Sequence, residues 1–295
     1  MVDVDLFEAK LREWVERVLG TKAGQLRGVS IDGKTLRVSQ KMGASNSHLL
    51  SVVTHTLGVV VGQWPVEDHT NEIGMMQRLL FDLMLEGRVV TADALLTQKE
   101  IAGTIIQKGG EYVLPLKENQ PDTLAALVEW FAEDPAPYEP PNMTTRQTEK
   151  GHGRLITRHL AATTALNEYL DWPGLAQAFM LRRRVVSLTT GQVRETVHYG
   201  ITSLSPEQAS PDDLLRFIRQ HWTIENQLHW VKDVIMEEDH CQLRTQRTHH
   251  LMALFRNLAL SLLRFTGHRH TASSLRFFAA RPDEAIQLVL SPIGE

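Results

Sequence analysis

The sequence has very little cysteine, no excess of positive charge and no long apolar run. Its single cysteine, Cys241, excludes an internal disulfide and a cysteine-rich zinc site, so a reducing, cytoplasmic setting is expected. Lys and Arg number 31 against 35 Asp and Glu, which gives a formal net charge of −4. That balance argues against a uniformly basic nucleic-acid coat protein, although it leaves room for a local basic patch.

The chain also lacks segments typical of membranes or secretion. Its longest stretch without Asp, Glu, Lys or Arg, residues 42–66, is interrupted by polar side chains and favours two strands separated near Gly58. The N-terminus carries Asp3, Asp5 and Glu8, where a secretory signal would carry a basic and then an apolar stretch. The composition is therefore that of a soluble globular protein, with no membrane partner expected.

Hydrophobic periodicity predicts an α/β fold. The order strand, strand, strand, helix, strand, helix, strand follows a first helix and suggests a mixed sheet flanked by helices. The predicted helices are 3–19, 74–85 and 97–107, and the predicted strands are 29–31, 49–57, 59–66, 89–91 and 112–116. Residues 121–210 are rich in proline and hold strand candidates at 155–161, 179–188 and 193–201, which predicts a β-rich insertion. Helices are expected again at 214–238 and 248–265.

One motif points to nucleotide binding. Residues 28–35 match the phosphate-loop pattern G-x-x-x-x-G-K-[ST]. Such a loop has to follow a buried strand and open a helix, whereas residues 21–27 make a poor buried strand and residues 36–46 a poor helix. The nucleotide-binding interpretation is therefore the weaker alternative.

Acidic residues at strand ends indicate a different chemistry. Asp32 follows a short strand, and Asp93 follows the strand at 89–91. Either acid alone is more often a turn or a helix cap, but two on short central strands suggest a shared site. A third acid, Glu225, lies on the helix predicted at 214–238.

Helical spacing places other polar residues around Glu225. At offsets of −4, −3, +4 and +7, the residues His221, Trp222, His229 and Lys232 share one α-helical face with Glu225. The alternative is an exposed polar face with packed tryptophans. Three carboxylates without paired His or Cys ligands suit Mg²⁺ or Mn²⁺, and two such ions ~4 Å apart support phosphodiester chemistry. His229 and Lys232 are then expected to contact phosphate.

Charge is distributed unevenly along the chain. Residues 241–281 contain seven arginines and no acidic residue, and Arg182, Arg183 and Arg184 form a second basic cluster. Such a run is often only a solvated face, but beside a metal site it favours contact with nucleic-acid phosphates.

Several motifs together resemble the H-repeat-associated family of bacterial insertion-sequence transposases, part of the DDE superfamily with an RNase H-like core. The matching stretches are 31–37 (IDGKTLR), 91–94 with 97–98, 112–121 (YVLPLKENQP), 151–154 (GHGR), 221–230 (HWTIENQLHW), 233–234 and 238–239. They occur in order with compatible gaps.

The resemblance implies that Asp32, Asp93 and Glu225 form the metal-binding triad. Its expected partition is an N-terminal helix at 1–24, catalytic core at 25–120, a β-rich insertion at 121–210, and the rest of the core with a basic helical region at 211–295. Family members cut double-stranded DNA at element ends and join it to a target. The resemblance therefore implies two Mg²⁺ or Mn²⁺ ions as cofactors, a homo-oligomer on DNA, and a cytoplasmic location at the nucleoid. The residues expected to contact DNA are Lys34, Arg182, Arg183, Arg184, His221, Trp222, Asn226, His229, Lys232, Arg244 and Arg247.

The sequence departs from the family pattern in three places. Relatives usually carry a further N-terminal region, of which residues 1–24 are expected to be the remnant. Leu155 and Ile156 follow the GHGR stretch, where relatives often have an acidic residue, and His221 stands where related transposases often have Arg. A catalytically silent, DNA-binding remnant therefore stays open as an alternative to an active enzyme.

Overall fold

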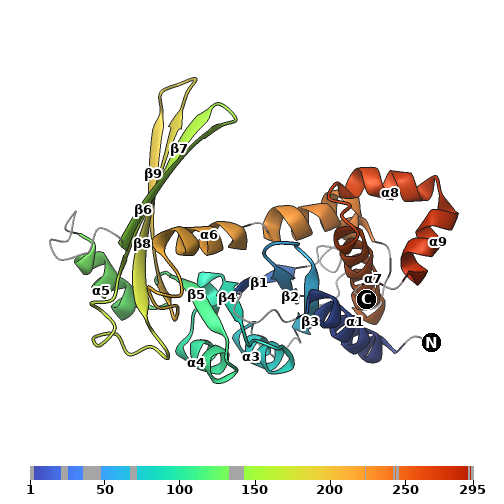
Figure 1. Ribbon diagram of the computed structural model, residues 1–295, viewed down its shortest axis with the longest axis horizontal. Coiled ribbons are helices and arrows are strands. Elements are labelled where there is room, and N and C mark those ends of the chain that lie inside the picture. Colours follow the sequence, from blue (N-terminus) through green and yellow to red (C-terminus); the bar gives the residue numbers. More distant parts are fainter. Residues whose placement is uncertain are drawn as a thin grey trace. The chain divides into compact units, whose positions relative to one another are not determined.

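The computed structural model contains both helices and strands, and it describes residues 3–20, 26–35, 48–66, 72–132, 143–222, 224–241, 243, 246–291 and 293 (Figure 1). The chain divides into two units, Met1–Leu79 with Gln220–Glu295, and Leu80–Arg219. The predicted α/β class is confirmed. No helix among the described residues is both long enough and apolar enough to cross a membrane.

Three antiparallel strands form the sheet of the first unit, in the order β3-β2-β1. They are β1 (Arg27–Thr35), β2 (His48–Thr54) and β3 (Val60–Val66). The residues that match the phosphate-loop pattern lie in β1, and those from Val29 onward pair with β2. The phosphate-loop interpretation is therefore wrong, because the backbone groups of a paired strand bond to the neighbouring strand and cannot wrap around a phosphate.

Two helices of the first unit pack against β3 of this sheet. Helix α1 (Val4–Leu19) begins at Asp3, whose side chain accepts the Leu6 N–H at 3.2 Å, and ends at Gly20. It packs against α7 (Gln246–Phe265), where the rings of Trp14 and Phe265 meet edge to face at 5.5 Å. Helices α8 (Thr271–Ala279) and α9 (Pro282–Leu290) follow, and α3 (Glu72–Asp82) crosses the boundary between the units.

The predicted helix at 214–238 is not one continuous α-helix, so that prediction is wrong. Helix α6 (Pro211–His221) ends at His221, and the turns Glu225–His229 and Val231–Ile235 are π-helical, followed by a 3₁₀ turn at Glu238–His240. The π-helical turns are anchored in the core of the first unit. The buried residues of that cluster are Val53, Val60, Ile224, Leu228, Val231 and Leu260.

Six strands form the sheet of the second unit, in the order β4-β5-β9-β8-β7-β6. Strands β4 and β5 are parallel and the other pairs are antiparallel. The strands are β4 (Arg88–Ala92), β5 (Glu111–Leu116), β6 (Thr144–Gly151), β7 (Arg154–Thr163), β8 (Gln177–Ser187) and β9 (Val193–Thr202). The strands of the expected insertion thus continue the sheet of β4 and β5, because β9 pairs with β5.

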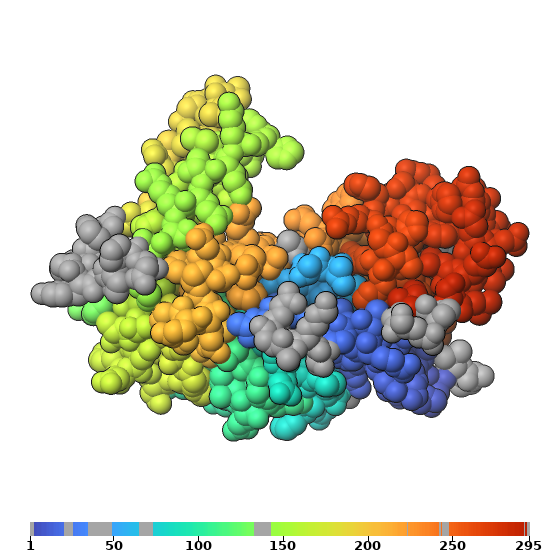
Figure 2. All heavy atoms as spheres, viewed as in Figure 1, coloured from blue at the N-terminus to red at the C-terminus, as the bar shows by residue number. Residues whose placement is uncertain are grey.

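Short helices connect the strands of the second unit. They are the 3₁₀ helix η1 (Ala94–Leu96), α4 (Lys99–Gln107) and α5 (Pro121–Trp130), which begins with a proline in its first turn. Along β6 to β9, the halves nearest the turns at 151–154 and 187–193 are partly or fully exposed, whereas the opposite halves of β7, β8 and β9 are buried. The exposed ends project from this unit as a slab (Figure 2).

Candidate metal centre

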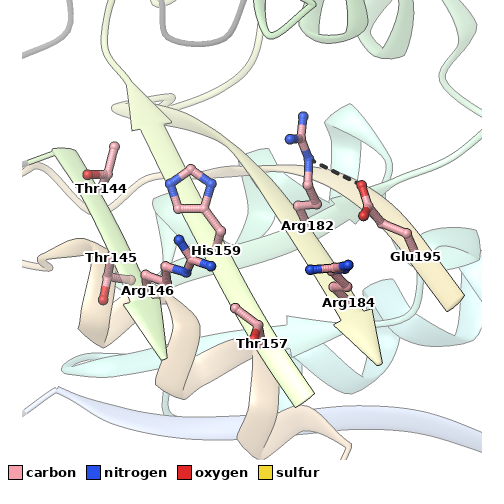
Figure 3. Close-up of a pocket in the computed structure, with 8 residues that line it drawn as sticks. All are labelled: Thr144, Thr145, Arg146, Thr157, His159, Arg182, Arg184 and Glu195. Atoms are coloured by element: carbon pink, nitrogen blue, oxygen red, sulfur yellow. Dashed lines mark ion pairs between the residues drawn. The ribbon is translucent and has the colours of Figure 1, made fainter. Parts of the chain in front are cut away.

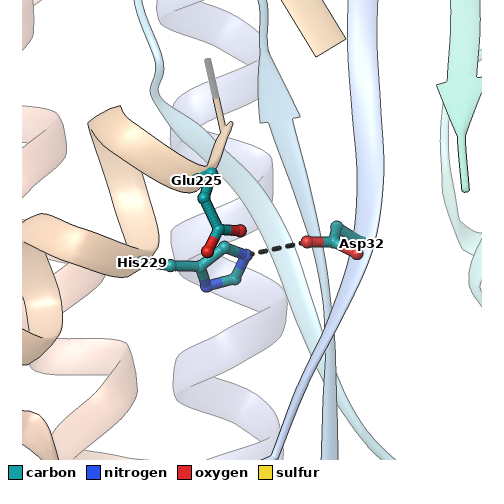
Figure 4. A group of neighbouring side chains, drawn as sticks. All are labelled: Asp32, Glu225 and His229. Atoms are coloured by element: carbon teal, nitrogen blue, oxygen red, sulfur yellow. Dashed lines mark ion pairs between the residues drawn. The ribbon is translucent and has the colours of Figure 1, made fainter. Parts of the chain in front are cut away.

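Three side chains of the first unit converge on one point (Figure 4). Asp32 comes from β1, and Glu225 and His229 come from the first π-helical turn. One ligand atom from each lies within 4.8 Å of the other two, and His229 Nε2 is 3.2 Å from Asp32 Oδ2. Carboxylates and imidazole are ordinary ligands of divalent metal ions, so these residues form a candidate metal centre.

The local charges keep Asp32 ionised. Burial by itself would raise the pKa of Asp32, but the close approach and charge of His229, the charge of His221 and the Gly33 N–H together lower it. The Gly33 N–H donates to Asp32 Oδ1 at 2.9 Å. An ionised Asp32 at the edge of solvent can accept a cation without first losing a proton, and the exposed Glu225 lies beside it.

The π-helical turn determines which residues accompany Glu225. The Trp230 N–H bonds to the Glu225 carbonyl, five residues back, and the Met236 N–H bonds to the Val231 carbonyl at 3.0 Å. These wider turns interrupt the regular α-helical spacing. His229, four residues on, still lies beside Glu225, whereas the Lys232 ammonium lies 3.0 Å from Glu238.

Comparison with known proteins decides the family. Residues 23–262 match the family model described as "Transposase DDE domain". The chain belongs to this DDE transposase family. The family has an RNase H-like core, so the predicted family and fold class are both confirmed.

Two transposases from Escherichia coli match most of this chain. It is 31% identical to the "H repeat-associated putative transposase YhhI" over 80% of the chain and 63% of YhhI. It is also 31% identical to the "Putative transposase YncI" over 89% of the chain and 68% of YncI. The chain thus spans just under two thirds of the length of YhhI. A cryo-EM structure of the piggyBac transposase synaptic complex with hairpin DNA aligns at a TM-score of 0.42 and 10% identity, over 84% of this chain and 48% of that one, a likeness too weak to carry an argument.

Two of the lysines that were expected to contact DNA lie in a buried charge cluster of this DDE chain. Lys232 is 1% exposed, and its ammonium lies 3.0 Å from Glu238. Lys34 contacts Asp233 and lies 2.8 Å from Glu238. Burial alone would lower the pKa of Lys34, but these two carboxylates outweigh it and raise the pKa. Both ammonium groups are therefore neutralised inside the protein, by Asp233 within the second π-helical turn and by Glu238 just after it.

Asp93 lies in the second unit at the end of β4. Its side chain is exposed, accepts the Ala94 N–H at 2.7 Å and so caps η1, and lies 3.6 Å from the Lys117 ammonium. Asp93 therefore does cap a helix, which was the alternative role that the sequence left open for it. One carboxylate can cap a helix with one oxygen and still present the other, so the role of Asp93 in the triad stays a prediction.

Residues around Glu225 differ in how open they are. Trp222 is 68% exposed and Asn226 is exposed, whereas His229 is buried at 6% exposure. Sequence reasoning assigned His229 to phosphate contact, but its ring points toward Asp32 (Figure 4). The spacing of four residues between Glu225 and His229 is the signal that could have suggested a shared metal site.

The basic cluster of β8 is divided between the two faces of the sheet. Side chains alternate along a strand, so Arg182 and Arg184 share one face and Arg183 lies on the other. Arg182 and Arg184 line a hollow of about 630 Å³ (Figure 3). The other residues that line it are Thr144, Thr145, Arg146, Thr157, His159 and Glu195.

The arginine-rich stretch near the C-terminus does not form a single basic surface. Arg264 donates to the carbonyls of Gly58 and Gln227, and the guanidinium of Arg256 is 4.0 Å from Glu238. Both guanidinium groups therefore bind partners within the first unit. Arg244 and the side chain of Arg247 lie outside the described residues.

Proposed function

We propose that this chain is the catalytic part of a DDE transposase that cuts and joins DNA strands with the help of divalent metal ions. The observation that supports this proposal most directly is the convergence of Asp32, Glu225 and His229, whose ligand atoms lie within 4.8 Å of one another. The donor set fits a hard or borderline divalent ion, because it combines two carboxylates with one imidazole.

In this proposal, different residues hold the metal ions and position the DNA. Asp32, Asp93 and Glu225 would hold the ions, and bound Mg²⁺ or Mn²⁺ would activate the attacking oxygen and stabilise the leaving oxygen. Family membership favours water and then a 3′-hydroxyl as the two nucleophiles. Trp222 and Asn226 are exposed beside the metal ligands, where they would position the DNA strand.

Loss of activity in variants of the three acids tests this proposal. Asp32→Asn, Asp93→Asn and Glu225→Gln are each expected to reduce nicking and strand transfer by several orders of magnitude, measured on DNA that carries the terminal inverted repeats. Glu168→Gln is the matched control for Glu225→Gln, because Glu168 is also exposed and lies in a loop of the second unit. Full activity in any one of the three acid variants would remove that residue from the triad.

Binding without cleavage has a separate meaning. If the wild-type chain binds the element ends in a gel-shift assay but cleaves them with neither Mg²⁺ nor Mn²⁺, the chain is the silent, DNA-binding form that the sequence left open. If it neither binds nor cleaves them, the proposal for this chain fails.

We further propose that the β8 face with Arg182 and Arg184 contacts the DNA backbone. Arg146 lies on the same face, because it pairs with His159 and His159 pairs with Arg182 across neighbouring strands. Glu195 is the acidic residue that lines this hollow, and it lies 3.7 Å from Arg182. The excess positive charge on an exposed sheet face is suited to phosphates.

Arg183 supplies a matched control, since it is the same residue type in the same strand but on the opposite face. Arg184→Ala should weaken DNA binding about equally for all sequences and reduce the slope of log affinity against log salt concentration by about 1. Arg183→Ala should change neither quantity. Equal effects of the two variants would contradict the assignment of this face.

A further inference from the structure

His229 is buried beside the candidate metal centre without an adequate partner. It is 6% exposed, and neither ring nitrogen has a hydrogen-bond partner of good geometry among the described residues. Buried polar nitrogens are ordinarily hydrogen bonded, so an unpaired one needs an explanation. The group to which Nε2 points is the Asp32 carboxylate, 3.2 Å away (Figure 4).

That separation matches the distance between two neighbouring ligands of one ion. Ligand atoms bonded at about 2.1 Å, at the angles of octahedral or tetrahedral coordination, lie about 3.0–3.4 Å apart. Glu225 offers a further oxygen within 4.8 Å of both other ligand atoms. Because Glu225 is exposed and His229 is buried, the imidazole would close the inner side of the site and leave the outer side open.

The backbone supports the same arrangement. The π-helical turn Glu225–His229 keeps both side chains on one face, and Leu228 beside them is 1% exposed in the core. Single π-helical turns are frequent at functional sites, where the wider turn redirects a side chain. Here it directs His229 toward Asp32 while Lys232 turns into the charge cluster.

We propose that His229 is a protein ligand of the same ion that Asp32 and Glu225 hold, which gives this site a preference for Mn²⁺ over Mg²⁺. The inference rests on the proposed function, because it adds a ligand to the site of that function. Mg²⁺ takes oxygen ligands and dehydrates reluctantly, whereas an imidazole nitrogen suits transition-metal ions. One nitrogen ligand thus discriminates between the two ions that the acids alone would accept.

Metal binding can be measured without any catalysis. Titration of Mn²⁺ followed by electron paramagnetic resonance gives the affinity, competition with Mg²⁺ gives the selectivity, and electron spin echo modulation detects a nitrogen bonded to Mn²⁺. The wild-type chain should show the nitrogen signal and bind Mn²⁺ more tightly than Mg²⁺. His229→Gln should lose the signal and at least about 10-fold of the Mn²⁺ affinity, since loss of even a residue that only orients a metal ligand typically costs about 10- to 100-fold, with a smaller change for Mg²⁺.

A second variant separates ligation from folding. His229→Glu replaces the nitrogen with an oxygen ligand, so it should retain binding but shift the preference toward Mg²⁺, an effect that a purely structural role would not produce. His250→Gln is the matched control, because His250 is also buried and its Nε2 lies 3.3 Å from Glu8 in the same unit. This control should leave Mn²⁺ affinity and the nitrogen signal unchanged.

The outcomes distinguish this inference from the proposed function. If the wild-type chain binds neither ion, the metal site of the proposed function fails. If it binds Mn²⁺ in a manner that Asp32→Asn abolishes, but shows no nitrogen signal and no change in His229→Gln, only the role of His229 is wrong.

Discussion

Replacement of Glu238 by glutamine removes the negative charge at the centre of the buried cluster in the first unit. The Glu238 side chain is 3% exposed, with the Lys34 ammonium 2.8 Å away and the Lys232 ammonium 3.0 Å away. The guanidinium of Arg256 lies 4.0 Å away. In Glu238→Gln, Asp233 would be the remaining acid paired with these three cations among the described residues, and it contacts only Lys34 of the three.

The expected loss of stability in Glu238→Gln can be derived in two ways. Removal of one partner from a buried ion pair typically destabilises a protein by about 3–5 kcal/mol. Burial alone would raise the pKa of Glu238, but Lys232 and Lys34 outweigh it and lower the pKa from its ordinary 4.5 to about 2. That difference corresponds to about 3 kcal/mol at neutral pH. Burial lowers the pKa of Lys232, and the charge of Glu238 offsets only part of that decrease. In Glu238→Gln, Lys232 can therefore lose its proton, which relieves some of the cost. We therefore expect a loss of about 3 kcal/mol.

Urea denaturation at pH 7, followed by far-ultraviolet circular dichroism, measures this loss. Glu284→Gln is the control, because Glu284 forms an exposed ion pair with Arg281 at 3.4 Å and should cost less than about 1 kcal/mol. The double variant Glu238→Gln with Lys232→Met should recover most of the stability, since it also removes the stranded charge. A loss below 1 kcal/mol in Glu238→Gln, or no recovery in the double variant, would refute the reasoning.

Three other predictions concern the first unit and the backbone turns. Gly58→Ala should cost up to about 1 kcal/mol more than Gly87→Ala in urea denaturation, because both glycines have a positive φ (+67° and +70°) but only at Gly58 would the new Cβ displace other atoms, with Gln227 Oε1 at 2.5 Å and Arg264 Nη1 at 3.1 Å; equal costs would show that crowding is unimportant. Arg264→Met should lower the free energy of unfolding by about 1–3 kcal/mol, because the carbonyls of Gly58 and Gln227 lose their donor, and an unchanged urea midpoint would contradict this. The contribution of Glu238 should be present above pH 4.5 and disappear as the pH falls through about 2, because its pKa is lower in the folded state; urea titrations at several pH values should therefore show wild type and Glu238→Gln converging toward pH 2.

Local pattern was sufficient for much of the fold. Amphipathic spacing predicted α1 and the helix at 248–265, and β-branched residues predicted β2 and β3, because each of these elements buries one face or both. Strand β6 was missed, since its sequence TTRQTEKG contains no aliphatic residue and its strand form depends on pairing with β7. Helix α5 also differs from the prediction, because the prolines of 121–210 indicate irregular and β structure by their composition, whereas Pro121 stands in the first turn of a helix, where proline is favoured.

The sequence likewise predicted some residues of the candidate site and not others. The acids Asp32 and Glu225 stand out in the sequence because each belongs to a motif, and the structure places them together. The expected contact of Lys232 with DNA stays a prediction, and its spacing along the sequence did not reveal that its ammonium pairs with Glu238 or that the helix continues in π-helical turns. Hydrogen bonds of the i to i+5 type depend on packing of the surrounding core, which spacing along the sequence does not reveal.

Motifs and hydrophobic periods are properties of neighbouring residues, so the family, the α/β class and the candidate acidic residues could be predicted from the sequence alone. Which cations are exposed and which are neutralised within the protein became clear only from the folded arrangement. Lys34 pairs with Glu238, 204 residues further along the chain. Whether a charge is neutralised depends on the groups that lie within a few ångströms of it, and folding alone brings such distant residues together.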